Sequence, residues 1–482
     1  MPNSRPPIGQ LPRLSAPSAR TGSTVGRNRP RQAGRLNLDE LRTAVAKGRI
    51  DTVLLALPDL QGRLKGKRYG ADHFLQRVAG GHADMCAYLL ATDAAMNPVD
   101  GFGLTSWENG YADLAVAPDL NTLRLMPWLP RTVVVLGHAL NPRGQQPLDV
   151  APRQMLLDQL ARLAAHGLHA KAGLESEFLL YEGLFTDTPH IGDGGLAPVS
   201  TANLDYALDH PPVLDRFLRR LQSALAGAGS PVEAVKTESA PGQVEVTFPY
   251  GPALEACDTH VLFKHAARTL AGRAGLTATY MAAPETGVAS GLHVHVSLWR
   301  SGNPALVTLD GDLSGIARQA IGGLVEVLPQ LAPLYAPNTN SYRRFTPGSF
   351  APTRMTWGHD NRTCAVRVVG HDSGLHLEVR VPGADANPYL ATAAVLAAIT
   401  HGLDQKLTAP PPRAANAYLA QDIPLLPATL DEALAVFRNS PLAEKAFGPE
   451  VVAHFAHLAQ VELAHQHGVV PDTERDRWFI QA

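Results

Sequence analysis

Apolar and polar residues alternate along the stretch GLESEFLLYE (residues 173–182), whose apolar content is otherwise typical of a buried strand. Because successive side chains of a strand point to opposite faces, Glu175 and Glu177 share one face, whereas Leu174 and Phe178 share the other. Two neighbouring carboxylates in an apolar place need cations, shared protons or water to be tolerated. The pattern therefore predicts a strand with one apolar and one acidic face.

Three further segments alternate in the same way. They are VKTESAPGQVEVTF with Glu238 and Glu245 on either side of a Pro-Gly turn, GLHVHVSL with His293 and His295 on one face, and LHLEVRVPG with Glu378 and Arg380 on one face. A half-exposed strand explains any one of these patterns. Four such strands in one chain, each bounded by apolar residues, predict that the acids and imidazoles converge on one site.

Helical spacing of apolar residues marks the segments between these strands. The expected helices are LNLDELRTAVAKGRI, QMLLDQLARLAAHG, VLDRFLRRLQSALAGAG, CDTHVLFKHAARTLAGRAG and a final region from Tyr389 onward. Asn37 is a suitable N-cap for the first of them. Earlier, TVLLALPDLQGRLKGKRYG predicts a strand, a turn and a strand, and TVVVLG predicts another buried strand.

The chain is divided by two changes in composition. Residues 1–35 contain no Asp or Glu and are rich in Arg, Pro, Ser and Gly, so we expect a disordered tail there. The segment NPRGQQPLDVAPR then interrupts the apolar pattern and is typical of a linker. We therefore expect a sheet-rich domain at 36–145 and a larger domain at 146–482.

Composition narrows the class of protein. With 482 residues, 45% apolar residues, 18% charged residues and a net charge of -2, the chain is an ordinary globular protein without a general basic field, so we expect no nucleic-acid partner. The longest apolar stretches, such as LATAAVLAAITHGL, are too short to span a membrane. Three widely spaced cysteines suit a reducing compartment, and we expect the cytoplasm.

The predicted site would be rich in oxygen ligands with some nitrogen. If the alternating strands converge, five glutamates and a histidine form a ligand set that suits Mg²⁺ or Mn²⁺ better than Zn²⁺. Such cations would also explain how paired acids can be buried.

Arginines supply the complementary charge. The segments SYRRFTPGSF, HDNRTCAVRVVG and LEVRVPG, which suit strands or structured loops, contain Arg343, Arg344, Arg362, Arg367 and Arg380. Guanidinium groups bind carboxylate and phosphate oxygens in a bidentate manner, so arginines beside divalent cations indicate phosphoryl transfer to an acidic substrate. The chain has no GxxxxGK[ST] loop and no GxGxxG after a strand, so an ATP site would be built from sheet side chains.

These motifs resemble, in order and spacing, the glutamine synthetase family. The resemblance rests on ESEF, ESAPGQVEV, SGLHVHVSL, NTNSYRRFTPG, NRTCAVRV and LEVRVPGADANPYLA, and it extends from about residue 36 to near the C-terminus. It implies an α+β fold, with a small β-grasp-like N-terminal domain and a large catalytic domain whose curved antiparallel sheet is flanked by helices. It further implies homo-oligomers of stacked rings, a dodecamer in the family, with active sites between neighbouring subunits.

The resemblance also assigns roles to individual residues. The matched ligands of one metal ion are Glu177, Glu238 and Glu245, and those of the other are Glu175, His293 and Glu378. The matched glutamate-binding residues are Arg344 and Arg380, and those that stabilise the transferring phosphoryl group are Arg362 and Arg367. The residues that fall where ATP is held are Glu233, His295 and Ser297. Asp100 falls where the N-terminal domain supplies an aspartate to the amine site of a neighbouring subunit.

The departures from the family pattern lie mainly at the amine end. Where ammonia-using members carry a glutamate, six residues after Arg344, this chain has Phe350, which cannot accept a proton but can hold a larger ammonium group by a cation–π contact. Val288 and Ala289 replace the Asn-Gly that usually contacts glutamate. Ser373 replaces a lysine that often meets the nucleotide phosphates.

Three functions remain open at this point. The resemblance favours an ATP-dependent ligase that joins the γ-carboxylate of glutamate to an organic amine, such as a polyamine or ethanolamine, through γ-glutamyl phosphate. It would use glutamate, ATP and two or three Mg²⁺ or Mn²⁺ ions per active site. The first alternative is an ammonia-using glutamine synthetase, and the second is a non-catalytic regulatory or structural member. Competent residues at all matched metal and arginine positions disfavour the second alternative.

Overall fold

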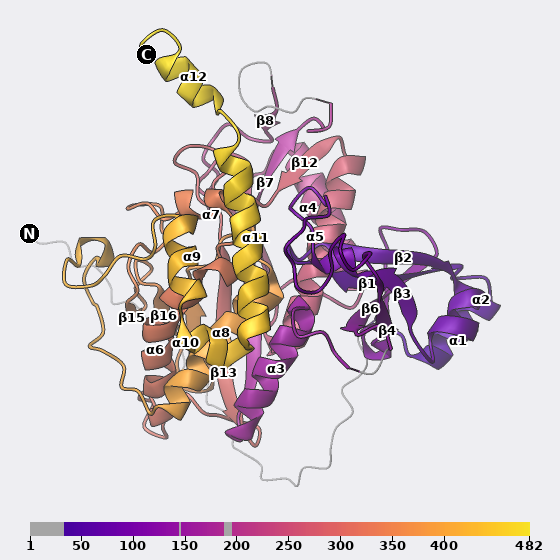
Figure 1. Cartoon of the computed structure of the whole chain (residues 1–482), viewed down its shortest axis with the longest axis horizontal. Helices are drawn as coiled ribbons and strands as arrows, with labels where there is room; N and C mark the ends of the chain where they lie inside the picture. Colours follow the sequence, from indigo (N-terminus) through magenta and orange to yellow (C-terminus); the bar gives the residue numbers. More distant parts are fainter. Residues whose placement is uncertain (1–32, 144–145, 188–194) are drawn as a thin grey trace, which may run out of the picture. The chain divides into compact units, whose positions relative to one another are not determined.

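A computed structural model describes residues 33–143, 146–187 and 195–482, and places the acidic strands in one eleven-stranded sheet (Figure 1). The main path of this sheet is β15 (Trp357–His359), β16 (Val366–Val369), β17 (His376–Val379), β13 (Leu292–Arg300), β7 (His169–Glu182), β10 (Gln243–Thr247) and β9 (Ala234–Thr237). Shorter strands at its margins are β8 (Ala197–Pro198), β11 (Gly251–Pro252), β12 (Leu276–Thr279) and β14 (Asn303–Pro304). All neighbours on the main path are antiparallel except β15 and β16.

The alternation of the sequence sets the two faces of β7, as predicted. Leu174 and Phe178 are buried on the apolar face, where each such side chain contributes about 2 kcal/mol by leaving water. Ser176 lies between them, and its hydroxyl is hydrogen-bonded at 3.0 Å to Nε2 of the buried His260. The other face carries the two glutamates. The strand therefore belongs to the core on one side and to the site on the other.

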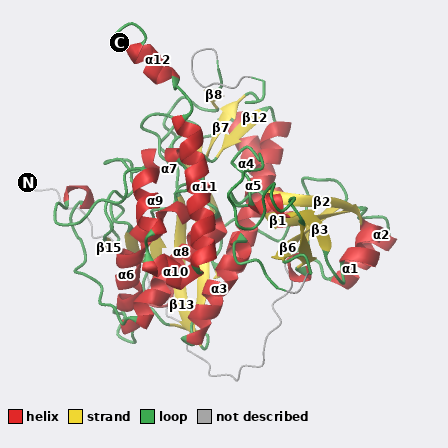
Figure 2. Cartoon of the chain, viewed as in Figure 1, coloured by secondary structure: helices red, strands yellow, loops and turns green. Residues whose placement is uncertain are grey.

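Helices flank the sheets (Figure 2). They are α1 (Leu38–Ala46), α2 (Ala71–His73), α3 (Pro152–Ala165), α4 (Pro212–Gly227), α5 (Ala253–Arg273), α6 (Gly315–Val327), α7 (Thr339–Arg343), α8 (Pro388–Asp404), α9 (Leu430–Arg438), α10 (Pro441–Phe447), α11 (Pro449–His467) and α12 (Asp472–Trp478). Helix α8 is apolar almost all round and packs against α3, α5 and α6, which explains its buried sequence. No helix in the described ranges has the length and apolar character needed to cross a bilayer.

Two helical predictions differ from the structure in detail. Helix α5 begins at Ala253, four residues before the predicted start at Cys257, and Glu255 in its first turn favours this earlier beginning through the helix dipole. The SYRRF segment, expected as a strand or structured loop, includes the end of α7. A capping box explains this helix, because Asn338 and Ser341 exchange side-chain to backbone hydrogen bonds.

A second sheet forms the N-terminal part of the structure. Its strands are β1 (Thr52–Pro58), β2 (Leu64–Gly70), β3 (Ala83–Cys86), β4 (Asp113–Pro118), β5 (Arg124–Leu125) and β6 (Thr132–Leu140). Strands β1 and β6 are parallel, and the other pairs are antiparallel. The predicted strand, turn and strand correspond to β1 and β2. Helix α1 precedes them with the predicted N-cap, since Asn37 accepts a hydrogen bond from the Glu40 N–H at 2.8 Å.

The N-terminal sheet is tied to the helices of the large sheet. Asn387, at the start of α8, donates to the carbonyl oxygens of Asp59 and Leu60, and Arg153 of α3 bridges Asp119 and Asp258. Residues 33–482 form one compact unit. The predicted division at 145 and 146 therefore stays a prediction.

Most of the expected N-terminal tail lies outside the described residues. Its last residues, however, join the fold: the Gly34 carbonyl accepts a hydrogen bond from the Leu125 N–H, and Arg35 forms an ion pair with Glu255. Residues 33–35 therefore belong to the fold.

Candidate active site

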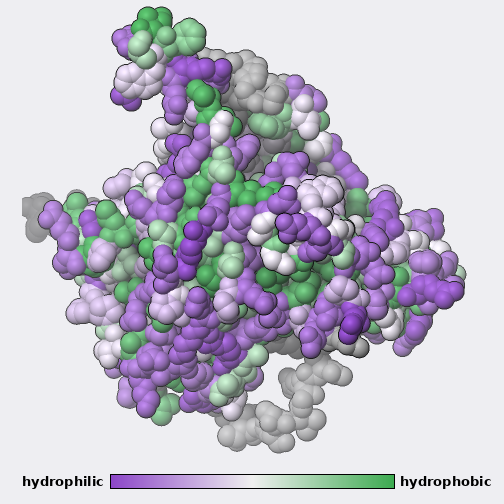
Figure 3. Space-filling model, in the orientation of Figure 1, coloured by the Kyte–Doolittle hydropathy of each residue, from purple (hydrophilic) through white to green (hydrophobic). Residues whose placement is uncertain are grey.

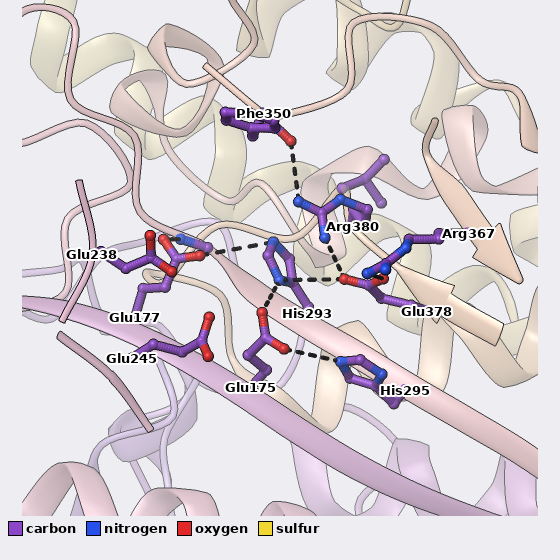
Figure 4. A network of polar contacts seen from close by, with 12 residues as sticks. Glu175, Glu177, Glu238, Glu245, His293, His295, Phe350, Arg367, Glu378 and Arg380 are labelled. Carbon is purple, nitrogen blue, oxygen red and sulfur yellow. Dashed lines mark hydrogen bonds and ion pairs between the residues drawn. The ribbon is translucent and has the colours of Figure 1, made fainter. Parts of the chain in front are cut away.

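Strand register aligns the polar side chains of the acidic face across β7 and its neighbours. The paired positions are Glu177 with Glu245, Glu175 with His293, His295 with Glu378, and Glu378 with Arg367. Glu238 joins them from the turn after β9, whose predicted reversal brings it back toward Glu245. Figure 4 shows these side chains pointing toward one another. The structure therefore brings together all six predicted metal ligands.

Within the described ranges, three groups of potential ligand atoms have members within 4.8 Å of one another. They are Glu177, Glu238 and Glu245; Glu175, Glu177 and His293; and Glu175, His295 and Glu378. The first group is the set expected for one metal ion. For the other expected set, His293 Nδ1 lies 2.6 Å from Glu175 Oε1 and 3.7 Å from Glu378 Oε1. The third group contains His295, for which the resemblance implies only a role in binding ATP.

Burial and charge crowding affect the carboxylates differently. Burial and, next in size, the adjacent Glu175 carboxylate together raise the pKa of Glu245 to about 10. Burial also raises the pKa of Glu177, against the attraction of His293. For Glu175, burial acts in the same direction, but the two neighbouring histidines hold its pKa well below the ordinary value. These opposing shifts show a site that needs positive charge to keep all its acids ionised.

Lys236 is a local cation that the sequence analysis missed. Its ammonium group forms an ion pair with Glu238 and lies 3.5 Å from Glu245 Oε2. The signal was present in VKTE, because Lys236 lies on β9 directly opposite Glu245. An acid-rich donor set with a lysine and arginines at its margins fits hard divalent cations.

Hydrogen-bond donors from the backbone and from a side chain fix the carboxylate of Glu177. The Gly291 N–H and the Gln243 side chain donate to Glu177 Oε2 at 2.8 and 2.9 Å. A Cβ at Gly291 would lie only 2.8 Å from both Arg344 Nη2 and His293 Nε2. A side chain at position 291 would therefore displace the ends of Arg344 and His293, two residues of the site.

Two of the predicted arginines contact Glu378. Arg380 forms an ion pair with it, and Arg367 Nη1 donates to Glu378 Oε2 at 3.0 Å. Arg344 donates to the carbonyl oxygens of Arg380 and Val381 at 3.2 and 3.1 Å. Burial lowers the pKa of Arg344 to about 10, so it remains a cation at neutral pH. Arg362 is exposed in the turn before β16, apart from these contacts.

Asp385 is a second residue that the sequence analysis missed. It is half-buried, and its Oδ2 accepts hydrogen bonds from Asn338 Nδ2 at 2.8 Å and Ser341 Oγ at 2.5 Å. Both donors belong to the start of α7, which leads into Arg344. Asp385 therefore joins the segment of one predicted glutamate-binding arginine to the segment of the other, Arg380.

A cavity of about 240 Å³ adjoins the cluster through His295. Its wall includes the three residues expected to hold ATP, Glu233, His295 and Ser297, and also Ser373. Trp299 lines it as well, with its indole N–H donating to Ser297 Oγ at 2.9 Å. The predicted phosphate-binding residues Arg362 and Arg367 are not part of this wall.

The predicted amine end consists of loops. Phe350 has a positive φ of 58°, its side chain is 61% exposed, and its carbonyl oxygen accepts from Arg380 Nη2 at 3.4 Å. Asp100 makes no hydrogen bond or ion pair with the cluster in the described part of the chain. Its carboxylate accepts from the Trp107 N–H, and its carbonyl oxygen contacts His457 of α11 at 2.7 Å. Its expected role toward a neighbouring subunit stays a prediction.

Val288 and Ala289 are two further departures from the family pattern. The carbonyl oxygen of Ala289 accepts a hydrogen bond from Gln243, the residue that also donates to Glu177. Val288 packs against the small apolar cluster that contains Leu179. These positions therefore support the site through the backbone and through packing.

Comparison with known proteins identifies the family. Residues 149–478 match the glutamine synthetase catalytic domain. The chain belongs to the glutamine synthetase family. Membership implies use of ATP and of a divalent cation, for which the acidic groups offer ligands. The predicted resemblance and the α+β fold class are confirmed.

Several relatives within the glutamine synthetase family are amine ligases. A γ-glutamylethanolamide synthetase of Streptomyces coelicolor is 44% identical over 92% of this chain and 96% of its own length. A glutamate–isopropylamine ligase of a Pseudomonas species is 33% identical over 91% of this chain and 97% of its own length. Among solved structures, apo GmaS superposes with a TM-score of 0.79 at 28% identity, covering 91% of this chain and 99% of GmaS.

Proposed function

We propose that this protein is an ATP-dependent ligase that joins the γ-carboxylate of glutamate to an organic amine through γ-glutamyl phosphate. The observation that carries the proposal is the convergence of the six ligand residues and three arginines beside a cavity lined by Glu233, His295 and Ser297. Phosphoryl transfer needs this combination, since catalysis there consists mainly of positioning and charge stabilisation.

Two or three Mg²⁺ or Mn²⁺ ions per site would be held by the acidic groups. One would be bound by Glu177, Glu238 and Glu245, and another by Glu175, His293 and Glu378. Bound cations would neutralise the charge on the transferring phosphate and on the buried acids. The proximity of these groups supports this assignment.

The arginines would hold the acid and the phosphoryl group. We assign glutamate binding to Arg344 and Arg380, whose guanidinium groups match carboxylate geometry. Arg367, 3.0 Å from Glu378, and Arg362 would stabilise the phosphoryl group during transfer. The amine would then attack the acyl phosphate, expelling phosphate and losing a proton to Asp100 of a neighbouring subunit, another acid or solvent.

Phe350 favours an organic amine over ammonia. Its exposed ring lies on the loop whose backbone contacts Arg380, and it provides a face for an alkylammonium group but no carboxylate for ammonium. Relatives named for ethanolamide, isopropylamine and putrescine products support the same choice.

An amine screen tests the proposal. The purified protein is incubated with ATP, Mg²⁺ and glutamate, the amine is varied across ammonia, ethanolamine, isopropylamine and putrescine, and phosphate release is measured. We expect release with at least one organic amine to exceed that with ammonia. Equal or greater activity with ammonia would favour a glutamine synthetase, and no release with any amine would favour a non-catalytic member.

We also propose that the chain forms homo-oligomers of stacked rings. Helix α12 has no buried residue, and the side chains of Trp478, Phe479 and Ile480 are 52%, 84% and 88% exposed. Figure 3 shows hydrophobic colour at the tip of the molecule where the chain ends. Light scattering of the purified protein gives the subunit number, and a monomeric mass at micromolar concentration would contradict the proposal.

A further inference from the structure

We propose that a cavity beside the loop of Asp100 is a second small-molecule site, which binds an amino alcohol through its hydroxyl and its ammonium group. The hydroxyl contacts the buried ring of His454, and the ammonium group contacts the carboxylates of Asp149 and Glu450. This inference goes beyond the proposed function, because binding in this cavity requires no reaction.

The cavity lies where three segments of the chain meet. Its volume is about 570 Å³, and its wall includes residues of the loop 101–104, of the segment 147–150 and of the first two turns of α11. This volume is within the range typical of small-molecule sites, about 300 to 1,000 Å³. Within the described ranges, the wall shares no residue with the acidic cluster or with the cavity assigned to ATP.

His454 supplies a buried hydrogen-bond acceptor to this wall. The residue is 4% exposed, and its Nε2 is shielded from solvent and has no hydrogen-bond partner in the described part of the protein. The ring donates to the backbone of Leu90, and it does so from Nδ1 because Nε2 has no partner. Burial lowers the pKa of His454 to about 4, so at neutral pH the Nε2 lone pair is free to accept. A buried acceptor of this kind is costly until a donor reaches it.

The exposed part of the wall has a different character. Asp149 and Glu450 are exposed carboxylates, and among the described residues that line the cavity there is no Lys or Arg. The side chains of Leu104, Leu148 and Val150 add apolar surface to the wall. The cavity therefore offers an acceptor at its buried end, carboxylates at its exposed end and apolar surface as well.

These features select the class of ligand. A donor at the buried Nε2 should be uncharged, because an ammonium group there would lose its hydration without a carboxylate partner. A cation is favoured at the exposed carboxylates, where it keeps part of its hydration. A molecule with a hydroxyl at one end, methylene groups and an ammonium group at the other end meets both requirements. This molecule is an amino alcohol.

A single metal ion fits the cavity less well. In the described part of the chain, Asp149, Glu450 and His454 are not among the groups whose potential ligand atoms all lie within 4.8 Å of one another. One ion therefore cannot contact all three residues, whereas an extended organic cation can.

The ligand would contact the support of the Asp100 loop. The ring of His454 packs 4.6 Å from that of Phe102, which lies 4.7 Å from the ring of His457. His457 in turn contacts the carbonyl oxygen of Asp100 at 2.7 Å. Occupation of the cavity should therefore hold this loop against α11.

Matched ligands test the inference on the full chain. Protein without ATP, glutamate and divalent cations is titrated with amino alcohols of increasing length, from ethanolamine to aminopentanol, and binding is followed by ligand-observed saturation-transfer NMR. The matched ligands are alkylamines in which a methyl group replaces the hydroxyl. For at least one length, we expect the amino alcohol to bind about tenfold more tightly, the usual effect of satisfying a buried acceptor.

Variants separate the two ends of the cavity. His454→Phe keeps a ring against Phe102 but removes the acceptor, so it should abolish the preference for the amino alcohol. Asp149→Asn and Glu450→Gln should each weaken both kinds of ligand by about threefold to fivefold and leave the preference unchanged. Glu444→Gln, at an exposed position of α10 outside the wall, is the matched control and should bind as the wild type does.

Three outcomes would overturn the inference. They are equal binding of amino alcohol and alkylamine at every length, an unchanged preference in His454→Phe, and binding that is lost in Phe350→Leu but kept in Asp149→Asn and Glu450→Gln. If His454→Phe fails to fold, the wild-type preference and the two carboxylate variants decide. Binding by a protein that releases no phosphate with any amine would leave the inference standing while the proposed function fails. Ligase activity without the preference would do the reverse.

Discussion

The ligand cluster and the amine end of this molecule are built in opposite ways. The cluster stands on strands, where the register of β7 with β10 and β13 fixes which side chains are neighbours. The amine end stands on loops, where Phe350 has a strained backbone and an exposed ring, and Asp100 contacts α11 through its backbone. The proposed phosphate-binding part is thus fixed by strand pairing, and the proposed amine end rests on few contacts.

This contrast explains how one family can use different amines. Changing a cluster residue disturbs several cross-strand partners at once, because Glu378 alone contacts two arginines and His293. Changing Phe350 disturbs only its loop. We therefore expect substitutions in the cluster to abolish turnover and substitutions at the amine end to redirect it.

The largest effect should follow from Glu378→Gln. The amide keeps the shape of the side chain but removes the charge that faces Arg367, Arg380 and the proposed cations, so turnover should fall about hundredfold to thousandfold. Phosphate release under saturating substrates measures this. Glu182→Gln, at the exposed end of β7, is the control and should retain activity. Near-normal turnover in the Glu378 variant would refute the site.

A fall in pH should weaken the packing of α11 against the loop that contains Asp100. Burial lowers the pKa of His454, on α11, to about 4 from an ordinary 6.5, and its ring packs 4.6 Å from that of Phe102. Between pH 6.5 and 4, His454 therefore binds a proton in the unfolded chain but not in the folded chain. The free energy of unfolding is highest above pH 6.5 and falls as the pH decreases toward 4. The loss should reach about 3 kcal/mol.

Urea unfolding at several pH values checks this expectation. His454→Gln removes the titrating ring and should give a smaller dependence of the unfolding free energy on pH between 6.5 and 4. An identical pH dependence in the variant and the wild type would show that another group is responsible.

A smaller effect is expected from Asp385→Ala. This change frees Asn338 and Ser341 at the start of α7 and so loosens Arg344, which should raise the KM for glutamate about tenfold while kcat changes less. Asp385→Asn, which retains one acceptor, should have a KM for glutamate between those of the wild type and Asp385→Ala. Initial-rate kinetics against glutamate distinguish this from a general defect, which would lower kcat at unchanged KM.

The smallest effect should come from Phe350→Glu. A carboxylate on this loop would favour ammonium, whereas loss of the ring would weaken the contact with an alkylammonium group, so the ratio of ammonia to organic-amine activity should rise about fivefold. Phe350→Leu lacks both features and should lower organic-amine use without raising ammonia use. An unchanged ratio in the glutamate variant would remove Phe350 from amine selection.

Sequence alone predicted the parts of this site that follow from local periodicity. Alternation placed Glu175 and Glu177 on one face of β7, and the Pro-Gly turn brought Glu238 near Glu245. It could not show that His295 shares a ligand group with Glu175, because that depends on the register of β13 against both β7 and β17. Contacts of this kind arise between segments far apart in the chain.

The same limit applies to the missed supporting residues. Lys236 gains its role only when β9 pairs with β10, and Asp385 only when its loop meets the start of α7. In the fold, long periodic elements such as α4 and β7 were predicted well. The start of α5 and the short α7 depended on helix-end interactions that apolar spacing does not reveal.

The hydrogen bonds from Arg344 to the backbone of Arg380 and Val381 have a consequence for evolution. They join two segments that are distant in the sequence, so that these segments can move only together. With the acid held by these arginines as proposed, its binding can be inherited intact while the loop of Phe350 accumulates changes, so new products could emerge in this lineage by mutation of a few surface positions.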